Sequence, residues 1–128
     1  MKTLTAEWLA KAEEDYSVAS GLLRRRKVPA DSICFHCQQA AEKLLKAVLQ
    51  DNGIRFGKTH DLEEILSLCA RAVPELALLL DDVTLLGDYA VRYRYPGMHA
   101  TKAQARSALK AVRRIRIAVR GLLRPGRN

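Results

Sequence analysis

The chain has 128 residues, of which 48% are hydrophobic and 28% are charged, a globular composition that excludes an intrinsically disordered protein. The longest candidate for a membrane span, residues 76–80, is far shorter than the roughly 20 apolar residues that cross a bilayer, and the N-terminus lacks the apolar run of a signal peptide. We therefore expect a cytoplasmic protein with no membrane span, in which the three cysteines are reduced.

The formal net charge of +8 is unevenly distributed along the chain. Residues 1–88 contain all 14 acids and have a net charge of −3, whereas residues 89–128 contain 11 Lys and Arg residues and no acid. Such a distribution favours an anionic partner, namely RNA, a nucleotide or an acidic protein surface. A solvated helix face explains the charges equally well, so both interpretations stand at this point.

The first two expected helices are long. One is predicted from about Thr5 to Arg26, where it ends in cations before Pro29; its apolar face is formed by Trp8, Ala12, Tyr16, Ala19 and Leu23. The second is predicted from an N-cap at Asp31 to about Asp51. Its apolar residues recur in steps of three and four and predict the central core helix: Ile33, Cys37, Ala40, Ala41, Leu44, Leu45 and Val48.

Two further helical segments follow the Asn52-Gly53 stop. Asp61 with Glu64 has the spacing of a capping box and predicts the start of a third helix, with Thr59 as a competing cap. Pro74 fits the first position of a fourth segment that continues through Leu86 and Tyr89, with a break near Asp81.

The last helix is expected to begin after a bend at Pro96-Gly97, with Thr101 and Gln104 as its capping box, and to end near Leu123. Its apolar face consists of Ala105, Ala108, Leu109, Val112, Ile115, Val119 and Leu122, and its basic face of Lys102, Arg106, Lys110, Arg113, Arg120 and Arg124. Short connections between these segments predict an all-α, up-and-down bundle of four to five helices over residues 1–123, followed by a flexible tail at 124–128.

The second helix also carries polar residues, Gln38, Gln39, Glu42, Lys43 and Lys46. We expect them on the protein surface, where Gln39 would pair with Lys43 and Glu42 with Lys46 at a spacing of four. The alternative is that they help to hold a functional site.

The pair Cys34 and Cys37 has C-x-x-C spacing, but neither a redox fold nor a second ligand pair accompanies it. Cys69 stands alone. Core packing is therefore the preferred interpretation, and no metal site is expected.

Four motifs, in this order, resemble the HEPN family (higher eukaryotes and prokaryotes nucleotide-binding) over nearly the whole chain. They are W-x-x-x-A-x-x-D at residues 8–15, CFHCQQAAEKLLKA at 34–47, KTHDL at 58–62, and YAVRYRYP at 89–96, which matches the family's R-Y-P segment. The resemblance implies a four- or five-helix bundle that forms a homodimer, often encoded beside a minimal nucleotidyltransferase. No cofactor is expected.

Many members of this family carry Arg-x4–6-His and cleave RNA without a metal, with the two motifs of a dimer facing each other. Here Arg94 and Arg92 precede His99 by spacings within that range. Histidine titrates near neutral pH and can move the protons of the reaction, and arginine matches phosphate oxygens. We therefore take Arg94, His99 and Arg92 as the candidate catalytic residues of a toxin-like ribonuclease.

The match departs from the toxin branch of the family in two ways. Ala100 and Thr101 follow His99, so the tyrosine that is adenylylated in that branch is absent, and Pro96-Gly97 interrupts the motif. The alternative function is a non-catalytic module that binds a nucleotide or the nucleotidyltransferase. Residues expected to contact a nucleotide or RNA are Lys46, His60, Lys102 and Arg106.

Overall fold

In the computed structural model, residues 2–123 can be described, and they form an all-α bundle without a strand in that range. The elements are α1 (Thr3–Leu23), α2 (Ala30–Asp51), α3 (Leu62–Ala72), the 3₁₀ helix η1 (Pro74–Leu79), α4 (Leu80–Arg92) and α5 (Lys102–Leu123). The expected tail, residues 124–128, lies outside the described residues. The five α-helices confirm the predicted fold class.

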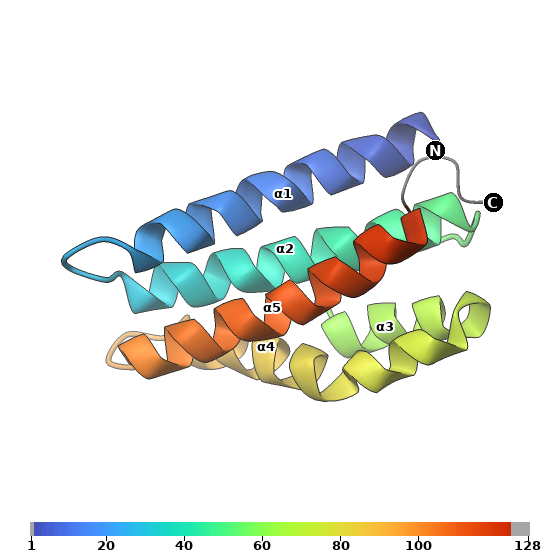
Figure 1. The fold of residues 1–128 in the computed structure, drawn as a ribbon. Coiled ribbons are helices and arrows are strands. Elements are labelled where there is room, and N and C mark those ends of the chain that lie inside the picture. The colour runs from blue at the N-terminus through green and yellow to red at the C-terminus, as the bar shows by residue number, and fades with distance from the viewer. Residues whose placement is uncertain (1, 124–128) are drawn as a thin grey trace.

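Helix α2 is the centre of the bundle (Figure 1). It lies between α1 on one side and α3 with α4 on the other, while α5 packs along its length. All seven apolar residues of the predicted core seam are buried. From the neighbouring helices, Ala12, Leu66, Val83 and Ile115 complete the same core. The steps of three and four residues in the sequence therefore identified the central helix correctly.

Several predicted helix ends are confirmed by their backbone geometry. Gly53 ends α2 with a φ of 67°, a left-handed conformation that glycine adopts without strain. The Asp61 carboxylate accepts hydrogen bonds from the amides of Glu63 and Glu64, so it is the N-cap of α3. Thr101 and Gln104 bond each other's amides reciprocally at 2.8 and 3.0 Å.

Breaks in the second half of the chain also follow the sequence. Pro74 begins η1, and the change from η1 to α4 at Leu80 accounts for the break expected near Asp81. Gly97 turns the chain between α4 and α5 with a φ of 87°.

Two predictions about the start of the bundle were wrong. Helix α1 ends at Leu23 rather than Arg26, so the run of cations at 24–27 lies in the connection to α2. Asp31 is not an N-cap, because α2 begins one residue earlier, after Pro29. The Asp31 carboxylate instead accepts a hydrogen bond of 2.6 Å from the amide of Ala100, just before α5. The carboxylate therefore bonds the amide of a residue that is distant in the sequence, and not the helix end that the local pattern predicted.

Candidate functional site

The polar residues of α2 form a partly buried row against the rest of the bundle. Gln38, Glu42 and Lys46 are buried, which contradicts the expectation of a solvent-exposed strip. The predicted pair between Glu42 and Lys46 is present, with Lys46 Nζ 3.0 Å from Glu42 Oε2. The predicted pair between Gln39 and Lys43 is not made. The cause is tertiary, because other segments of the chain cover this face and offer the polar groups better partners.

Glu42 is the centre of this buried row. Its side chain is 4% exposed, and besides Lys46 it accepts a hydrogen bond from Nδ1 of His60 at 2.9 Å. Gln38 Nε2 lies 3.5 Å from the same carboxylate and 3.4 Å from the carbonyl oxygen of His60. A buried carboxylate needs such partners, because desolvation without them costs several kcal/mol. The KTHDL turn is thus bonded to α2 through both the ring and the backbone of His60.

Asp15 makes a second connection between motifs, from α1 to α2. Its carboxylate accepts hydrogen bonds from Nδ1 of His36, at 2.9 Å, and from the ammonium of Lys43. Gln39, the residue expected to pair with Lys43, donates to Oε1 of Gln38 at 2.7 Å instead. Sequence reasoning gave no role to Asp15, although its place in the opening motif was a signal that could have drawn attention to it.

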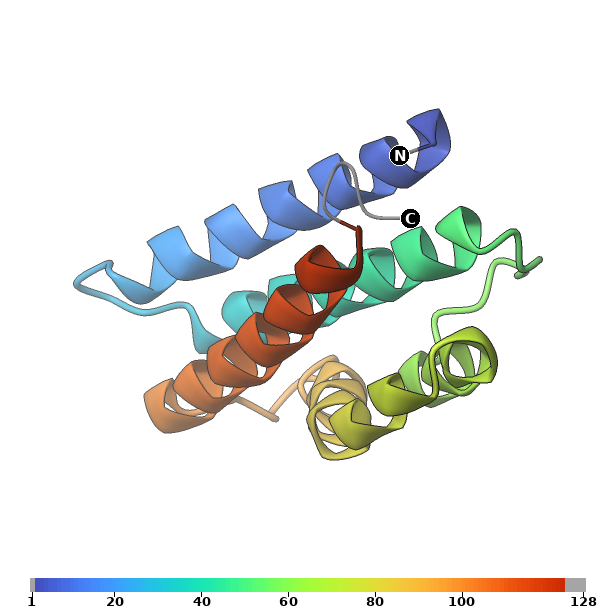
Figure 2. The same cartoon turned by 45° about the vertical axis from the view of Figure 1, so that its right-hand side comes forward.

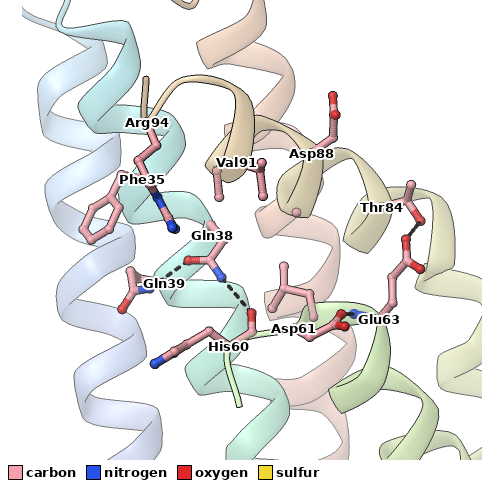
Figure 3. Close-up of a pocket in the computed structure, with 13 residues that line it drawn as sticks. Phe35, Gln38, Gln39, His60, Asp61, Glu63, Thr84, Asp88, Val91 and Arg94 are labelled. Atoms are coloured by element: carbon pink, nitrogen blue, oxygen red, sulfur yellow. Dashed lines mark hydrogen bonds between the residues drawn. The ribbon is translucent and has the colours of Figure 1, made fainter. Parts of the chain in front are cut away.

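A groove of about 830 Å³ opens beside this row, between α2, α4 and the start of α3. Figure 3 shows Arg94 reaching into it from the end of α4, toward Gln38 and beside Phe35. Toward the start of α3 the groove is acidic, with Asp61 and Glu63 (Figure 3). Exposed apolar side chains, Phe35 and Val91, form part of its wall. The groove therefore has one cationic and one anionic end, joined by apolar and amide groups.

On the other side of His60 lies a second hollow of about 510 Å³. Trp8 and Phe56 pack edge to face there, and the ammonium of Lys46 lies 5.6 and 5.8 Å from their ring centroids. These distances are within cation–π range, so the rings and Glu42 together stabilise the charge of a lysine that is 5% exposed. Two predicted binding residues, Lys46 and His60, thus meet at one carboxylate.

His99 lies elsewhere, in the connection between α4 and α5. Its Nδ1 is 3.1 Å from Oδ2 of Asp31, and its side chain is 77% exposed. It lines a shallow hollow of about 390 Å³ with the start of α2. A carboxylate only accepts hydrogen bonds, so Nδ1 carries the proton, and in the neutral ring Nε2 is left as an acceptor facing solvent.

The two candidate arginines are both exposed. Arg92 pairs with Asp88, one turn earlier on α4, at 2.9 Å. Hydrogen bonding to Tyr93 and the charge of Asp88 raise the pKa of Arg92 above its usual value. Arg94 lines the groove, whereas His99 lines the separate hollow next to Asp31, and the two linings have no residue in common. Within one chain, the structure therefore brings Arg94 and His60 to one groove but not Arg94 and His99.

Three arginines of α5 make tertiary ion pairs, and of the predicted basic face only Arg120 is among them in the described residues. Arg116 bonds Glu13 in a bidentate manner at 2.8 and 2.9 Å, and Arg120 lies 3.3 Å from the same carboxylate. Arg114 makes a similar bidentate pair with Asp82. These residues hold α5 against α1 and α4. The other two predicted binding residues, Lys102 and Arg106, are exposed at the start of α5, and within residues 2–123 they have no carboxylate partner.

The three cysteines are free and buried, as core packing predicted. Burial raises the pKa of the Cys34 thiol to about 11 and that of Cys69 to about 12, and it raises the pKa of Cys37 further. Across the described part of the chain, no group of three or more His, Cys, Asp or Glu side chains is placed to hold a metal ion. In the same residues, no helix is both long and apolar enough to cross a membrane.

Comparison with known proteins agrees with this fold. The model of the HEPN domain family matches residues 5–122. A protein of Methanocaldococcus jannaschii named "Putative toxin MJ1304" is 49% identical over 49 residues, which are 38% of this chain and 31% of that relative. The match therefore spans about a third of that protein's length.

Two solved structures have the same fold over nearly the whole chain. The crystal structure of TT1696 from Thermus thermophilus has a TM-score of 0.74 and 26% identity, and the alignment covers 95% of this chain and 100% of that one. The crystal structure of ST0689, described as an archaeal HEPN homologue, has a TM-score of 0.70 and 27% identity, covering 94% and 98%.

Proposed function

The chain belongs to the HEPN domain family, and on this premise we propose that it is a toxin-like, metal-independent ribonuclease that acts as a homodimer. The observation that carries the proposal is the pair formed by His99 and Asp31. An exposed imidazole held at Nδ1 by a carboxylate has a fixed orientation and a free Nε2. That arrangement suits a group that exchanges protons with a bound substrate.

The reaction uses the RNA's own 2′-hydroxyl. A neutral His99 takes the proton of this hydroxyl, O2′ forms a bond to phosphorus, and the bond from phosphorus to O5′ breaks. A protonated His99 from the second subunit gives its proton to O5′. The products are a 2′,3′-cyclic phosphate and a 5′-hydroxyl, so atoms and charge balance without an added reactant. Arg94 stabilises the charge on the phosphate through two parallel hydrogen bonds, and Arg92 assists from the end of α4.

A homodimer is part of the proposal because Arg94 and His99 line separate hollows in one chain. The groove is also self-complementary in charge. Under two-fold symmetry, Arg94 of one copy meets the acidic end of the other, where Asp61 and Glu63 lie. Phe35 and Val91, two exposed apolar side chains, line this groove, and pairing would cover them.

A minimal nucleotidyltransferase is the partner that we propose for this toxin-like protein. The name of the M. jannaschii relative describes a toxin, which suits a protein kept inactive by a second protein. Since no tyrosine lies two residues after His99, control by adenylylation at that position is not part of the proposal. Co-purification with a nucleotidyltransferase encoded by an adjacent gene tests this partnership.

The second candidate is a non-catalytic module that binds a nucleotide or the nucleotidyltransferase. The separation of Arg94 from His99 within one chain favours it. The groove volume of about 830 Å³ lies in the range of small-molecule sites. In the non-catalytic module, His60 and Lys46, which both bond the Glu42 carboxylate, hold the nucleotide phosphate or the partner's surface.

One experiment separates the two candidates. Wild-type protein should cleave RNA in excess EDTA and leave 2′,3′-cyclic phosphate ends. His99→Ala should lower the rate by about 10²–10⁴-fold, the usual contribution of a positioned acid or base. Asp31→Asn, which keeps an acceptor for the Ala100 amide but removes the charge beside His99, should lower it by a smaller factor.

The controls are the folded state and the source of the activity. Both variants should remain helical dimers, because His99 is exposed and contributes nothing to the core. Equal cleavage by wild type and His99→Ala would assign the activity to a contaminant and reject the nuclease. Binding of RNA or a nucleotide without cleavage would favour the non-catalytic module.

A further inference from the structure

The run of cations at residues 24–27 occupies an unexpected place. Because α1 ends at Leu23, Arg24, Arg25, Arg26 and Lys27 lie in the connection to α2, and all four are exposed. The sequence predicted these residues at the C-terminal end of the first helix. In the folded chain they project from one end of the bundle, which also contains the connection between α4 and α5 (Figure 1).

Helix geometry places the start of α5 at the same end of the bundle as this run. Nε of Arg113 donates to the hydroxyl of Tyr16 at 3.1 Å, which fixes α5 against α1. Both views show the two helices running in opposite directions (Figures 1 and 2). Seven residues of an α-helix make two turns and rise about 10 Å along its axis, so two residues seven apart lie on the same face. Moving back from Arg113 to Arg106 therefore corresponds to moving forward from Tyr16 to Leu23.

Along the helix axes, Arg106 thus lies level with the end of α1, and Lys102 lies one turn further, level with residues 24–27. The two connections at this end are also joined directly, since Asp31 bonds the amide of Ala100 and the ring of His99. We call this surface the basic end and define it by six residues: Arg24, Arg25, Arg26, Lys27, Lys102 and Arg106. Its two halves are about 75 residues apart in the sequence.

Unlike Arg114, Arg116 and Arg120 of α5, the cations of the basic end have no carboxylate partner within residues 2–123. Arg114 and Arg116 are neutralised by Asp82 and Glu13. Asp31, whose carboxylate joins the two connections, is already bonded to Ala100 and His99. Six exposed charges of one sign at one end produce a local potential that attracts a polyanion.

We propose that the basic end binds the phosphate backbone of single-stranded RNA. Four of its six cations are arginines, whose guanidinium groups match phosphate oxygens in two parallel hydrogen bonds. Tyr95, in the adjacent connection, is 61% exposed and offers a ring on which a base can stack. His99, bonded to Asp31, lies where the two connections meet, so a strand bound here reaches the proposed nuclease residue.

An acidic protein surface is a poorer occupant of the basic end. Stable protein interfaces have apolar or aromatic side chains at their centre. Among the described residues, no exposed large apolar side chain lies between residues 19 and 34 or between 99 and 116. Binding through charge and stacking, which RNA supplies, fits this composition. One part of this proposal rests on the proposed function, namely that the bound strand runs toward His99.

The test uses a fluorescent single-stranded RNA with 2′-O-methyl groups, which cannot be cleaved through its 2′-oxygen, and measures anisotropy over a range of salt concentrations. Two variants each remove two charges from the basic end, Arg25→Gln/Arg26→Gln and Lys102→Gln/Arg106→Gln. The matched control, Lys11→Gln/Arg71→Gln, removes two exposed charges that lie elsewhere, on α1 and α3. All three double variants therefore have a net charge of +6 instead of +8.

Each basic-end variant should weaken binding about 10-fold or more at low salt, and should lower the slope of log affinity against log salt by about 1.4. At physiological salt, where the Debye length is about 8 Å, the control should change binding less than about 3-fold, because more distant charges are screened. Circular dichroism and thermal melting should show all variants folded, since the side chains that change are exposed.

Three outcomes would overturn the proposal. Equal losses in the control and in the basic-end variants would mean that only net charge attracts RNA. Unchanged binding in Arg25→Gln/Arg26→Gln would show that the α1–α2 connection does not contribute to RNA binding. Displacement of the RNA by polyglutamate at equal charge would assign the surface to an acidic protein. If the basic end binds RNA but normal RNA stays intact, the surface stands and the proposed nuclease alone is rejected.

Discussion

The buried carboxylate of Glu42 on α2 accepts a hydrogen bond of 2.9 Å from Nδ1 of His60, a residue whose own side chain is 73% exposed. This bond connects the turn before α3 to the centre of the bundle. His60 itself lines both the groove and the second hollow. The same carboxylate holds Lys46, so one acid fixes both residues.

Removing the charge of Glu42 should destabilise the protein strongly. In Glu42→Gln, the ammonium of Lys46 stays buried and loses its counter-charge, so the free energy of unfolding should fall by about 3 kcal/mol. Urea unfolding followed by circular dichroism measures the change. The double variant Glu42→Gln/Lys46→Met is the control, because it leaves no uncompensated charge and should be more stable than Glu42→Gln alone. A single variant as stable as the wild type would show that the pair contributes nothing.

A charge on the apolar wall of the groove should prevent dimer formation. Light scattering should report about twice 14.3 kDa for the wild type. Val91→Asp, at a side chain that is 58% exposed, should give a folded monomer, because the acid would face its own copy across a two-fold axis. Ile117→Asp, at the exposed face of α5, is the matched control and should remain a dimer. A wild-type monomer at micromolar concentration would rule out a ribonuclease site that is formed by residues of two subunits.

The three thiols should react only when the fold opens. Burial raises the pKa of Cys34 to about 11 and the pKa of Cys69 to about 12, and it raises that of Cys37 as well. Since the thiolate is the reactive form, a disulfide reagent at pH 7.5 should modify the native protein slowly. In urea, all three cysteines should react at once. Rapid reaction of one thiol in the native protein would indicate local opening at that site.

Acid should weaken the contact between α1 and α5. Hydrogen bonds from Arg116, and the charges of Arg116 and Arg120, lower the pKa of Glu13 from its usual 4.5, against the opposing effect of partial burial. A carboxylate with a lowered pKa contributes stability that is fully present above the unfolded-state pKa and is lost as the pH falls through the folded-state pKa. Thermal melting of the wild type should therefore drop more steeply below about pH 4.5 than that of Glu13→Gln. Parallel curves would contradict this role.

Most of the fold could be predicted from the sequence, because the signals are local. Apolar residues at steps of three and four in residues 33–48 identify a helix buried on one broad face. Caps such as Asp61 and Thr101 act within three residues, so their geometry can be inferred without the rest of the chain. Helix ends were less certain, as the difference between Arg26 and Leu23 shows, because backbone hydrogen bonds there compete with solvent.

The site could be predicted only in part. The motifs identified His60, Lys46, Arg94 and His99 as chemically suitable residues, but spacing in the sequence could not tell which of them meet. Arg94 and His99 are five residues apart and line different hollows, whereas Lys46 and His60 are 14 apart and share a carboxylate. The partners themselves, Asp31 and Asp15, were misassigned or missed.

The sequence by itself determined which residues form helices and which faces of those helices are apolar, because both depend on neighbours within one or two turns. Only the tertiary structure decided which polar groups are buried and what they bind. The sequence predicted Glu42 as a surface acid, whereas in the structure the KTHDL turn covers it. Residues 24–27 are part of a basic surface because α5 packs against α1. Burial and electrostatic potential depend on distances in space, and packing sets these distances.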